Sequence, residues 1–399
     1  MTTFEVKEIS CENPLIRSYK VNINGSKIIT PTKTVSVTKN DDSELKIASH
    51  FIGKNYHPLG EVYTSLSIAE LNLLKNKDEI GIEFNNKISN RLSALKSEGI
   101  VPYLVLSIND NNKNPYNQML PDDLLEFVFD ILWGANGNSI IVPPLMGLLP
   151  DKKDYIKLIN ALNARVKMSI DRKNLPVMAP IPSSYNLIDP KLLEEYWNIG
   201  CRMFAFNCEN KKYGGYGYMI EKLHKELTVL SKKNEENYIL SALNSKFKVG
   251  KQESSRINNL LGAGFGFDIY SKNHIAPKFM SNNESNHFLF NSNDYGFETL
   301  SNVCTGNEKY ENILNSITFK NMDLETIDNS SSYKKRNITL KYNTEQSIKE
   351  VSLYSQYIDE NELYNYFSKK TKIQNEVVAM EKISGEVSSG GTRSLDEWF

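Results

Sequence analysis

The chain has 399 residues, which is enough for one large domain with an extension or for two domains. Lys and Arg total 47 and Asp and Glu total 48, so the overall charge neither requires nor excludes a nucleic-acid partner. We find no apolar run that could cross a membrane and no secretory signal in the first residues. The 4 cysteines and 5 histidines form no local metal motif, so only distant parts of the chain together could form a metal site. We therefore expect a cytoplasmic protein with reduced thiols.

Residues 18–38 have the pattern of a β-hairpin. Residues 21–23 and 27–29 are short apolar strands on either side of Asn24-Gly25, a dipeptide that favours a two-residue turn. Pro31 ends the second strand, and an extended run resumes at residues 34–37. The sequence thus predicts an N-terminal hairpin.

From residue 80 onward, apolar strand patterns alternate with helical patterns. Predicted strands cover residues 80–84, 101–106, 139–142, 177–181, 203–206 and 238–240, and predicted helices cover 87–98, 121–133, 152–164, 190–198 and 219–230. Such alternation is typical of parallel βαβ units, of which we expect about seven or eight strands. An open doubly wound sheet and a closed barrel both fit. No G-x-G-x-x-G follows the first strand, which favours an α/β fold of the (β/α)8 TIM-barrel type, with its site at the carboxyl ends of the strands.

A carboxylate stands out in the stretch that closes this series. A predicted helix at residues 254–261 ends at Gly262, and a predicted strand follows at 265–270. Asp268 lies in that strand among bulky apolar neighbours, where a carboxylate must be neutralised, paired or used. At the carboxyl end of a barrel strand such a residue is typically catalytic. An aspartate that caps the next turn is an equal alternative.

The amino-acid composition and the pattern of predicted elements change after about residue 290. Residues 291–333 are rich in Asn and Ser, residues 336–342 fit a strand or an extended lead-in to helices, and residues 344–381 read as two helices. Residues 384–392 are rich in Gly and Ser and resemble a flexible linker. We therefore divide the chain into a barrel of residues 1–290, a C-terminal α-rich extension of residues 291–383 and a flexible tail of residues 384–399.

The order of these segments resembles the tRNA-guanine transglycosylase family over roughly residues 18–275. Residues 21–32 resemble its opening hairpin with the T-P pair, and residues 177–185 and 199–207 stand where the family has G-I-I-Q-G-S and D-I-G-F-D-G-Y. Residues 262–271 resemble G-I-D-M-F-D, the most specific of these motifs. By this resemblance, Asp268 is the nucleophile that attacks the ribose C1′ while guanine leaves, and a 7-deazaguanine then replaces it.

The resemblance also suggests other site residues. Asp110 is the nearest match to the family's second carboxylate, which handles protons at the departing base, although the glycines of that motif are missing. Gly214, Gly215 and Tyr216 lie close to the family's base-contacting loop, and a mobile surface loop is an equal interpretation of this run. We expect Tyr216 and Tyr270 to stack on an extruded base.

Two departures from the family change what we expect of the site. Pro143-Pro144 and Pro182-Ser183 replace its base-recognition residues, and its zinc-binding cysteines are absent. We therefore expect no metal or other cofactor. Either the base pocket differs or the chemistry has been lost.

The C-terminal residues resemble the peptide that binds PCNA, the sliding clamp. The motif consists of Thr392, where the peptide has glutamine, followed by Leu395, Trp398 and Phe399. The apolar residues lie on one side of a single helical turn, which suits an apolar groove. A terminal helix packed on its own core is the alternative.

A clamp-bound enzyme would meet duplex DNA, so we favour DNA over tRNA as the substrate. The first hypothesis is guanine exchange in DNA through an aspartyl intermediate, with recruitment by PCNA. The alternatives are a degenerate barrel that binds nucleic acid at the replication fork without turnover, and an ordinary tRNA enzyme. A generic TIM-barrel hydrolase is the background interpretation.

Overall fold

The protein is a mixed α/β structure whose central strands run parallel. The computed structural model describes residues 4–23, 25–37, 43–53, 56–112, 114–136, 140–147, 149, 151–168, 176–250, 255–274, 287–299, 316–318 and 332–389. In this part of the chain, no helix combines the length and the apolar character that crossing a membrane requires.

The parallel strands form two sheets that meet along one short piece of chain. The five-stranded sheet has the order β4-β14-β11-β10-β9, and the four-stranded sheet has the order β5-β6-β7-β8. Only Thr34 separates β4 from β5, so the sheets continue into each other and neighbouring strands follow the order of the chain. The bounds are β4 (Thr32–Lys33), β5 (Val35–Ser36), β6 (Leu59–Ser67), β7 (Val101–Asn109), β8 (Ile140–Ile141), β9 (Met178–Ile181), β10 (Met203–Asn207), β11 (Ile239–Leu243) and β14 (Ile269–Tyr270).

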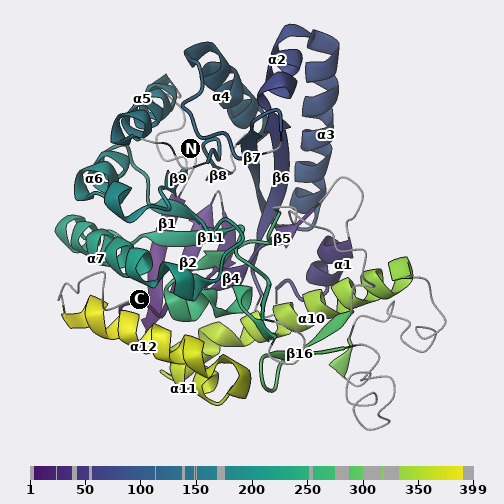
Figure 1. Ribbon diagram of the computed structural model, residues 1–399, viewed down its shortest axis with the longest axis vertical. Helices are drawn as coiled ribbons and strands as arrows, with labels where there is room; N and C mark the ends of the chain where they lie inside the picture. Colours follow the sequence, from purple (N-terminus) through teal and green to yellow (C-terminus); the bar gives the residue numbers. More distant parts are fainter. Residues whose placement is uncertain are drawn as a thin grey trace.

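Amphipathic helices lie between successive strands and pack around the outside of the sheets (Figure 1). They are α1 (Ser43–Ser49), α2 (Ile68–Asn76), α3 (Asp78–Ser97), α4 (Asp122–Asn136), α5 (Lys152–Met168), α6 (Pro190–Asn198) and α7 (Gly217–Asn234). The ends of α6 show why the sequence forms it there. The Asp189 side chain accepts the Lys191 N–H at 2.7 Å, Pro190 opens the first turn, and Gly200 follows the helix with φ +94°.

The predicted hairpin is confirmed, and it belongs to a three-stranded antiparallel sheet. Its strands are β1 (Phe4–Cys11), β2 (Arg17–Ile23) and β3 (Ser26–Ile29). Its apolar side chains share one buried cluster with the first residue of almost every parallel strand. These members are Tyr19, Val21, Ile23 and Ile28 of the hairpin, and Leu59, Val101, Ile140, Met178, Met203, Ile239 and Ile269 of the strands. The hairpin therefore covers the amino-terminal ends of the strands, and the face that it contacts is called the inner face below.

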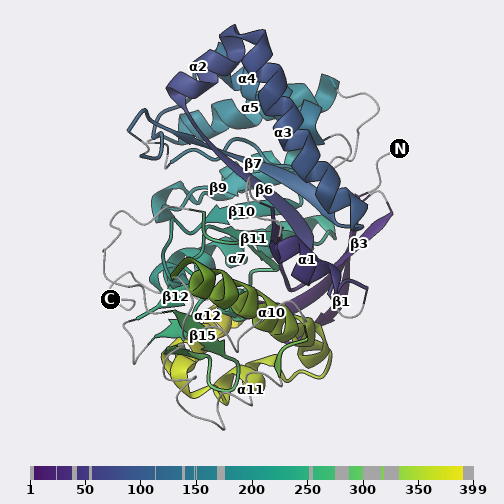
Figure 2. The same ribbon diagram turned by 90° about the vertical axis from the view of Figure 1, so that its right-hand side faces the viewer.

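The C-terminal elements lie together at one end of the molecule (Figures 1 and 2). They comprise a small antiparallel sheet, two 3-10 helices and three α-helices, of which α10 packs against α1 and α12 packs against α7. The bounds are β12 (Lys248–Val249), β13 (Arg256–Ile257), η4 (Asn259–Phe265), β15 (Phe288–Asn291), β16 (Gly296–Thr299), α10 (Ser332–Asp359), α11 (Leu363–Ser368), η5 (Thr371–Ile373) and α12 (Gln374–Ser389).

Five predictions of secondary structure are wrong. Residues 80–84 lie in α3 and residues 336–342 lie in α10, because both segments satisfy a helical period as well as an alternating one. Residues 254–261 were expected to form a helix, but the described part of this segment contains β13 and the start of η4. The strand expected at 265–270 is only Ile269–Tyr270, because η4 extends to Phe265 and a turn follows it. The expected linker at 384–392 is helical as far as Ser389.

Candidate functional site

The carboxyl ends of the parallel strands form one edge, which we call the carboxyl edge. It is marked by the last residues of β6, β7, β10 and β11, which are Ser67, Asn109, Asn207 and Leu243. Parallel α/β proteins place their sites at this edge, because the loops that follow the strands converge there.

A buried carboxylate and an imidazole meet where β5 and β14 end. Glu61 lies on the inner face of β6, opposite the last residue of β5, and its side chain is only 1% exposed. His274 follows β14, and its Nε2 lies 3.2 Å from Glu61 Oε2. The Thr34 hydroxyl donates to the same oxygen at 3.3 Å. Glu61 therefore holds the imidazole from inside the sheet.

One further contact of the ring and two hydrogen bonds around the backbone position His274. The ring of Tyr63 stacks on it with a centroid separation of 4.2 Å and an interplanar angle of 7°. The backbone N–H of His274 donates to Asn244 Oδ1 at 3.1 Å, and Asn244 Nδ2 donates to Asn207 Oδ1 at 3.2 Å. Asn244 has φ 53°, in the left-handed region that functional sites often contain. The ring is thus held by neighbours from three strands or the loops that follow them.

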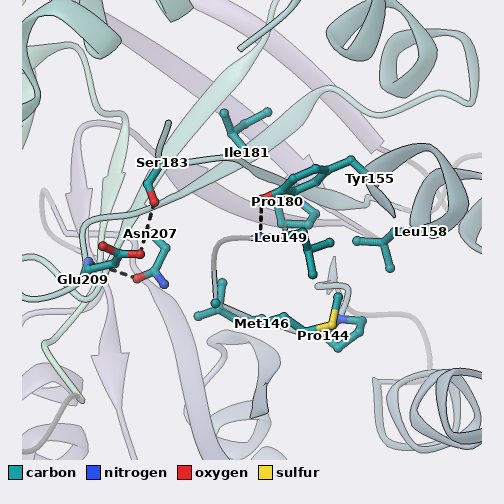
Figure 3. A pocket seen from close by; sticks show the side chains of 12 residues that line it. Pro144, Met146, Leu149, Tyr155, Leu158, Pro180, Ile181, Ser183, Asn207 and Glu209 are labelled. Atoms are coloured by element: carbon teal, nitrogen blue, oxygen red, sulfur yellow. Dashed lines mark hydrogen bonds between the residues drawn. The ribbon is translucent and has the colours of Figure 1, made fainter. Parts of the chain in front are cut away.

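A small pocket opens beside this cluster, at the carboxyl ends of β8, β9 and β10 (Figure 3). One wall is apolar and the other is polar. The apolar lining comes mainly from Pro144, Leu145, Met146, Leu149, Tyr155, Leu158, Pro180 and Ile181. The polar lining comes from Ser183, Asn207 and Glu209. Asn207 belongs to both the pocket and the hydrogen bonds around His274, so the two features are parts of one site.

The polar wall of the pocket is organised by Glu209. Its Oε1 accepts the Ser183 hydroxyl at 3.2 Å, and its backbone N–H donates to Asn207 Oδ1 at 3.2 Å (Figure 3). Its other oxygen lies 3.1 Å from Lys211 Nζ. Glu209 has φ 47°, which is uncommon for a residue other than glycine. The side chain is 31% exposed, so its carboxylate remains accessible to a ligand.

Lysines surround part of this edge. Lys211 and Lys212 follow β10 and Lys246 follows β11, and all three are exposed. The two loops touch, because the Lys246 N–H donates to the Lys211 carbonyl at 3.2 Å. Lys272 follows β14 on the next strand. Lys212 and Lys246 therefore place positive charge next to the pocket, whereas Lys211 is paired with Glu209 and Lys272 with Glu44.

Asp268, the predicted nucleophile, lies at the other end of the strands. It precedes β14, is 2% exposed, and accepts hydrogen bonds from Arg17 Nη2 at 3.1 Å and from the Leu240 N–H at 2.7 Å. Burial raises the pKa of Asp268 to about 6, while Arg17 and the Leu240 N–H act in the opposite direction. The pair ties the hairpin strand β2 to the parallel strands. The pairing that the sequence left open for this carboxylate is thus observed.

Asp110 lies at the carboxyl edge, directly after β7. Its Oδ1 accepts the backbone N–H groups of Asn112 and Asn114, each at 2.8 Å. The bond from the Asn114 backbone lowers the pKa of Asp110. Since the strands run parallel, Asp110 and Asp268 lie at opposite ends of them, and the structure does not bring the two carboxylates together.

The predicted base-contacting residues lie near the edge but outside the pocket. Gly214 and Gly215 are exposed in the 3-10 helix η2 (Tyr213–Tyr216) after β10. The buried Tyr216 donates from its hydroxyl to the Cys208 carbonyl at 3.1 Å. Tyr270 is fully buried against η4. Neither tyrosine ring lines the pocket in Figure 3.

The C-terminal motif of Thr392, Leu395, Trp398 and Phe399 lies outside the described residues. The sequence interpretation missed Glu61, His274 and Glu209. A signal for Glu61 was present, because it is a carboxylate in an apolar strand, as Asp268 was taken to be. Glu209 lies three positions after the end of the predicted strand at residues 203–206, which was a signal in the sequence. No local pattern in the sequence marks His274.

Within the described ranges, no group of three or more His, Cys, Asp and Glu side chains is arranged to hold a metal ion. The chain matches no model of a known protein family, and no curated protein sequence matches it either.

Proposed function

We propose that the parallel strands form a closed (β/α)8 barrel of the transglycosylase type. Two observations support this proposal. The strands from β4 to β14 neighbour one another in the order of the chain, and the hairpin covers their amino-terminal ends. To close the barrel, β8 would have to lie next to β9. These two are the outer strands of the two sheets.

We further propose that this barrel binds a guanine-type base of a nucleic acid at its carboxyl edge. Glu209 in the apolar pocket is the observation that carries the proposal. A carboxylate has two acceptor oxygens, which suit the adjacent N1–H and N2–H donors of guanine. The facing apolar wall suits a flat ring.

The lysines beside the pocket suit the backbone of the same ligand. Phosphate groups are bound mainly by Lys and Arg side chains, which position a nucleic acid without reading its sequence. Lys211, Lys212 and Lys246 project from loops that border the pocket edge. A base extruded from the helix would enter the pocket while its neighbouring phosphates contact this rim.

Binding without covalent exchange fits this geometry better than exchange through Asp268. A nucleophile must reach the sugar of the bound base, and Asp268 is buried at the opposite end of the strands. The preference for DNA, and recruitment by PCNA through the C-terminal motif, remain proposals that rest on the resemblance of the tail.

Calorimetric titration with guanosine and adenosine tests the base specificity. We expect the chain to bind guanosine in preference to adenosine. Glu209→Gln should weaken guanosine binding by at least about tenfold, because an amide cannot accept both N–H donors. Glu194→Gln is the control, since Glu194 pairs with Lys233 on the surface of α6. Equal binding of both nucleosides, or an unchanged Glu209→Gln variant, would contradict the proposal.

Incorporation of radiolabelled guanine into duplex DNA and into bulk tRNA tests covalent exchange. We expect no incorporation into either. Label that disappears in a folded Asp268→Asn variant would restore exchange through that residue, and the labelled polymer would identify the substrate.

A further inference from the structure

We infer that Glu61 and His274 form an acid–base pair that hydrolyses the bond between the bound base and its sugar. The inference rests on the base binding proposed above and adds a catalytic activity to it. Four features of the site carry the argument: the contact between the two side chains, their different exposure, the hydrogen bonds that join them to the pocket, and an unsatisfied carboxylate oxygen.

The contact fixes the chemistry of the imidazole. His274 Nε2 lies 3.2 Å from Glu61 Oε2, so the proton of a neutral ring is held on Nε2 by the carboxylate. Nδ1 is then the basic nitrogen, and it forms no hydrogen bond that we observe with the described residues. A carboxylate behind the ring also stabilises the imidazolium that forms when Nδ1 takes up a proton.

The two side chains of the pair are buried to different extents. Glu61 is 1% exposed and His274 is 11% exposed, so the carboxylate lies inside and the imidazole lies nearer the mouth of the site. Glu61 Oε1 and the hydroxyl of Ser36, its neighbour across the sheet, have no hydrogen-bond partner among the described residues. Buried polar atoms in this condition usually bind water or a ligand.

The other titratable groups around the pair do not compete for the proton. Burial raises the pKa of Tyr63 and of Tyr103, so both phenols stay protonated at neutral pH. Lys272 is close in sequence, but its ammonium group is paired with Glu44. Neither the two phenols nor Lys272 therefore competes with His274 for a proton.

Asn244 connects the pair to the pocket. Its Oδ1 accepts the His274 N–H, and its Nδ2 donates to Asn207, which lines the pocket. Tyr63 stacks on the imidazole from the neighbouring strand. A nucleotide whose base contacts Glu209 would thus direct its sugar toward the imidazole.

The reaction balances with water as the only co-reactant. His274 Nδ1 takes a proton from water while the water oxygen forms a bond to C1′ of the nucleotide. The bond from C1′ to the base nitrogen breaks, and its electron pair leaves with the base. The imidazolium then returns the proton to the base. The products are a free base and an abasic site.

Release of the base from radiolabelled duplex DNA and tRNA by the full chain tests the inference. We expect free guanine and an equal amount of abasic sites from wild-type protein. His274→Gln should reduce the rate by about 100-fold or more, the usual contribution of a general base. His50→Gln is the matched control, because His50 is an exposed histidine after α1. Thermal unfolding should show that each variant is folded.

Two measurements separate catalysis from a structural role. Imidazole added to the His274→Ala variant should restore part of the rate, which it could not do for a merely misfolded site. Glu61 is a positioning residue, so Glu61→Gln should lower the rate and shift the midpoint of its pH profile downward, since the carboxylate no longer stabilises the imidazolium.

The outcomes distinguish the two proposals. Absence of base release, or release that His274→Gln leaves unchanged, overturns the hydrolytic pair even if guanosine binds. Failure of guanosine to bind overturns the pocket assignment, whereas release that depends on His274 supports the pair in either case.

Discussion

Replacement of Asp268 by asparagine is expected to lower the free energy of unfolding by about 3–5 kcal/mol, the usual cost of removing one partner of a buried ion pair. The variant keeps the shape of the side chain and an acceptor for the Leu240 N–H. It leaves the Arg17 guanidinium without its carboxylate in a site where the two side chains are 5% and 2% exposed.

The surroundings of Arg17 explain why the loss of unfolding free energy should be this large. Its guanidinium lies over the rings of Tyr238 and Tyr19, at 4.2 Å and 5.2 Å from their centroids. Aromatic rings attract a cation but do not neutralise it. The uncompensated charge therefore remains buried between the hairpin and the parallel strands.

Urea unfolding monitored by circular dichroism measures this loss. The control is the double variant Arg17→Met with Asp268→Leu, which removes both charges and should regain most of the stability, because replacing a whole buried pair by apolar residues is often neutral. An Asp268→Asn variant within about 0.5 kcal/mol of wild type would refute the structural role and favour a functional one.

Two further predictions concern buried groups. Gly266→Ala should lower the free energy of unfolding clearly more than Gly200→Ala, for which a loss of about 1–2 kcal/mol is expected. Both glycines have positive φ, but only the Cβ at position 266 meets the His224 ring, at 2.3 Å. Equal losses of unfolding free energy would count against the packing. Burial raises the pKa of the Cys201 thiol to about 12, so a thiol reagent at pH 8 should label it only after denaturation, as peptide mass spectrometry would show.

Elements with local stop signals were predictable. Helix α6 forms where expected because Asp189 caps it, Pro190 starts it and Gly200 ends it. The buried strands β7 and β10 were visible as apolar runs that follow a glycine turn. In these cases the chain carries both the core-facing pattern and its boundaries.

Segments without such signals were predicted wrongly. Residues 80–84 alternate apolar and small or charged residues, yet they form the start of α3 with Ile82 61% exposed. The alternation had no buried face to serve, since helix packing against β6 and β7 uses residues further along α3 such as Leu92 and Leu95.

The sequence by itself determined the alternating α/β organisation, the N-terminal hairpin and the kind of residue to look for, a carboxylate within an apolar strand. Only the tertiary structure decided which carboxylate faces the carboxyl edge. Because β14 begins at Ile269, Asp268 lies before the strand, at its amino-terminal end. Glu61, His274 and Glu209 come from different strands and loops, and their convergence depends on sheet register, which no local pattern encodes.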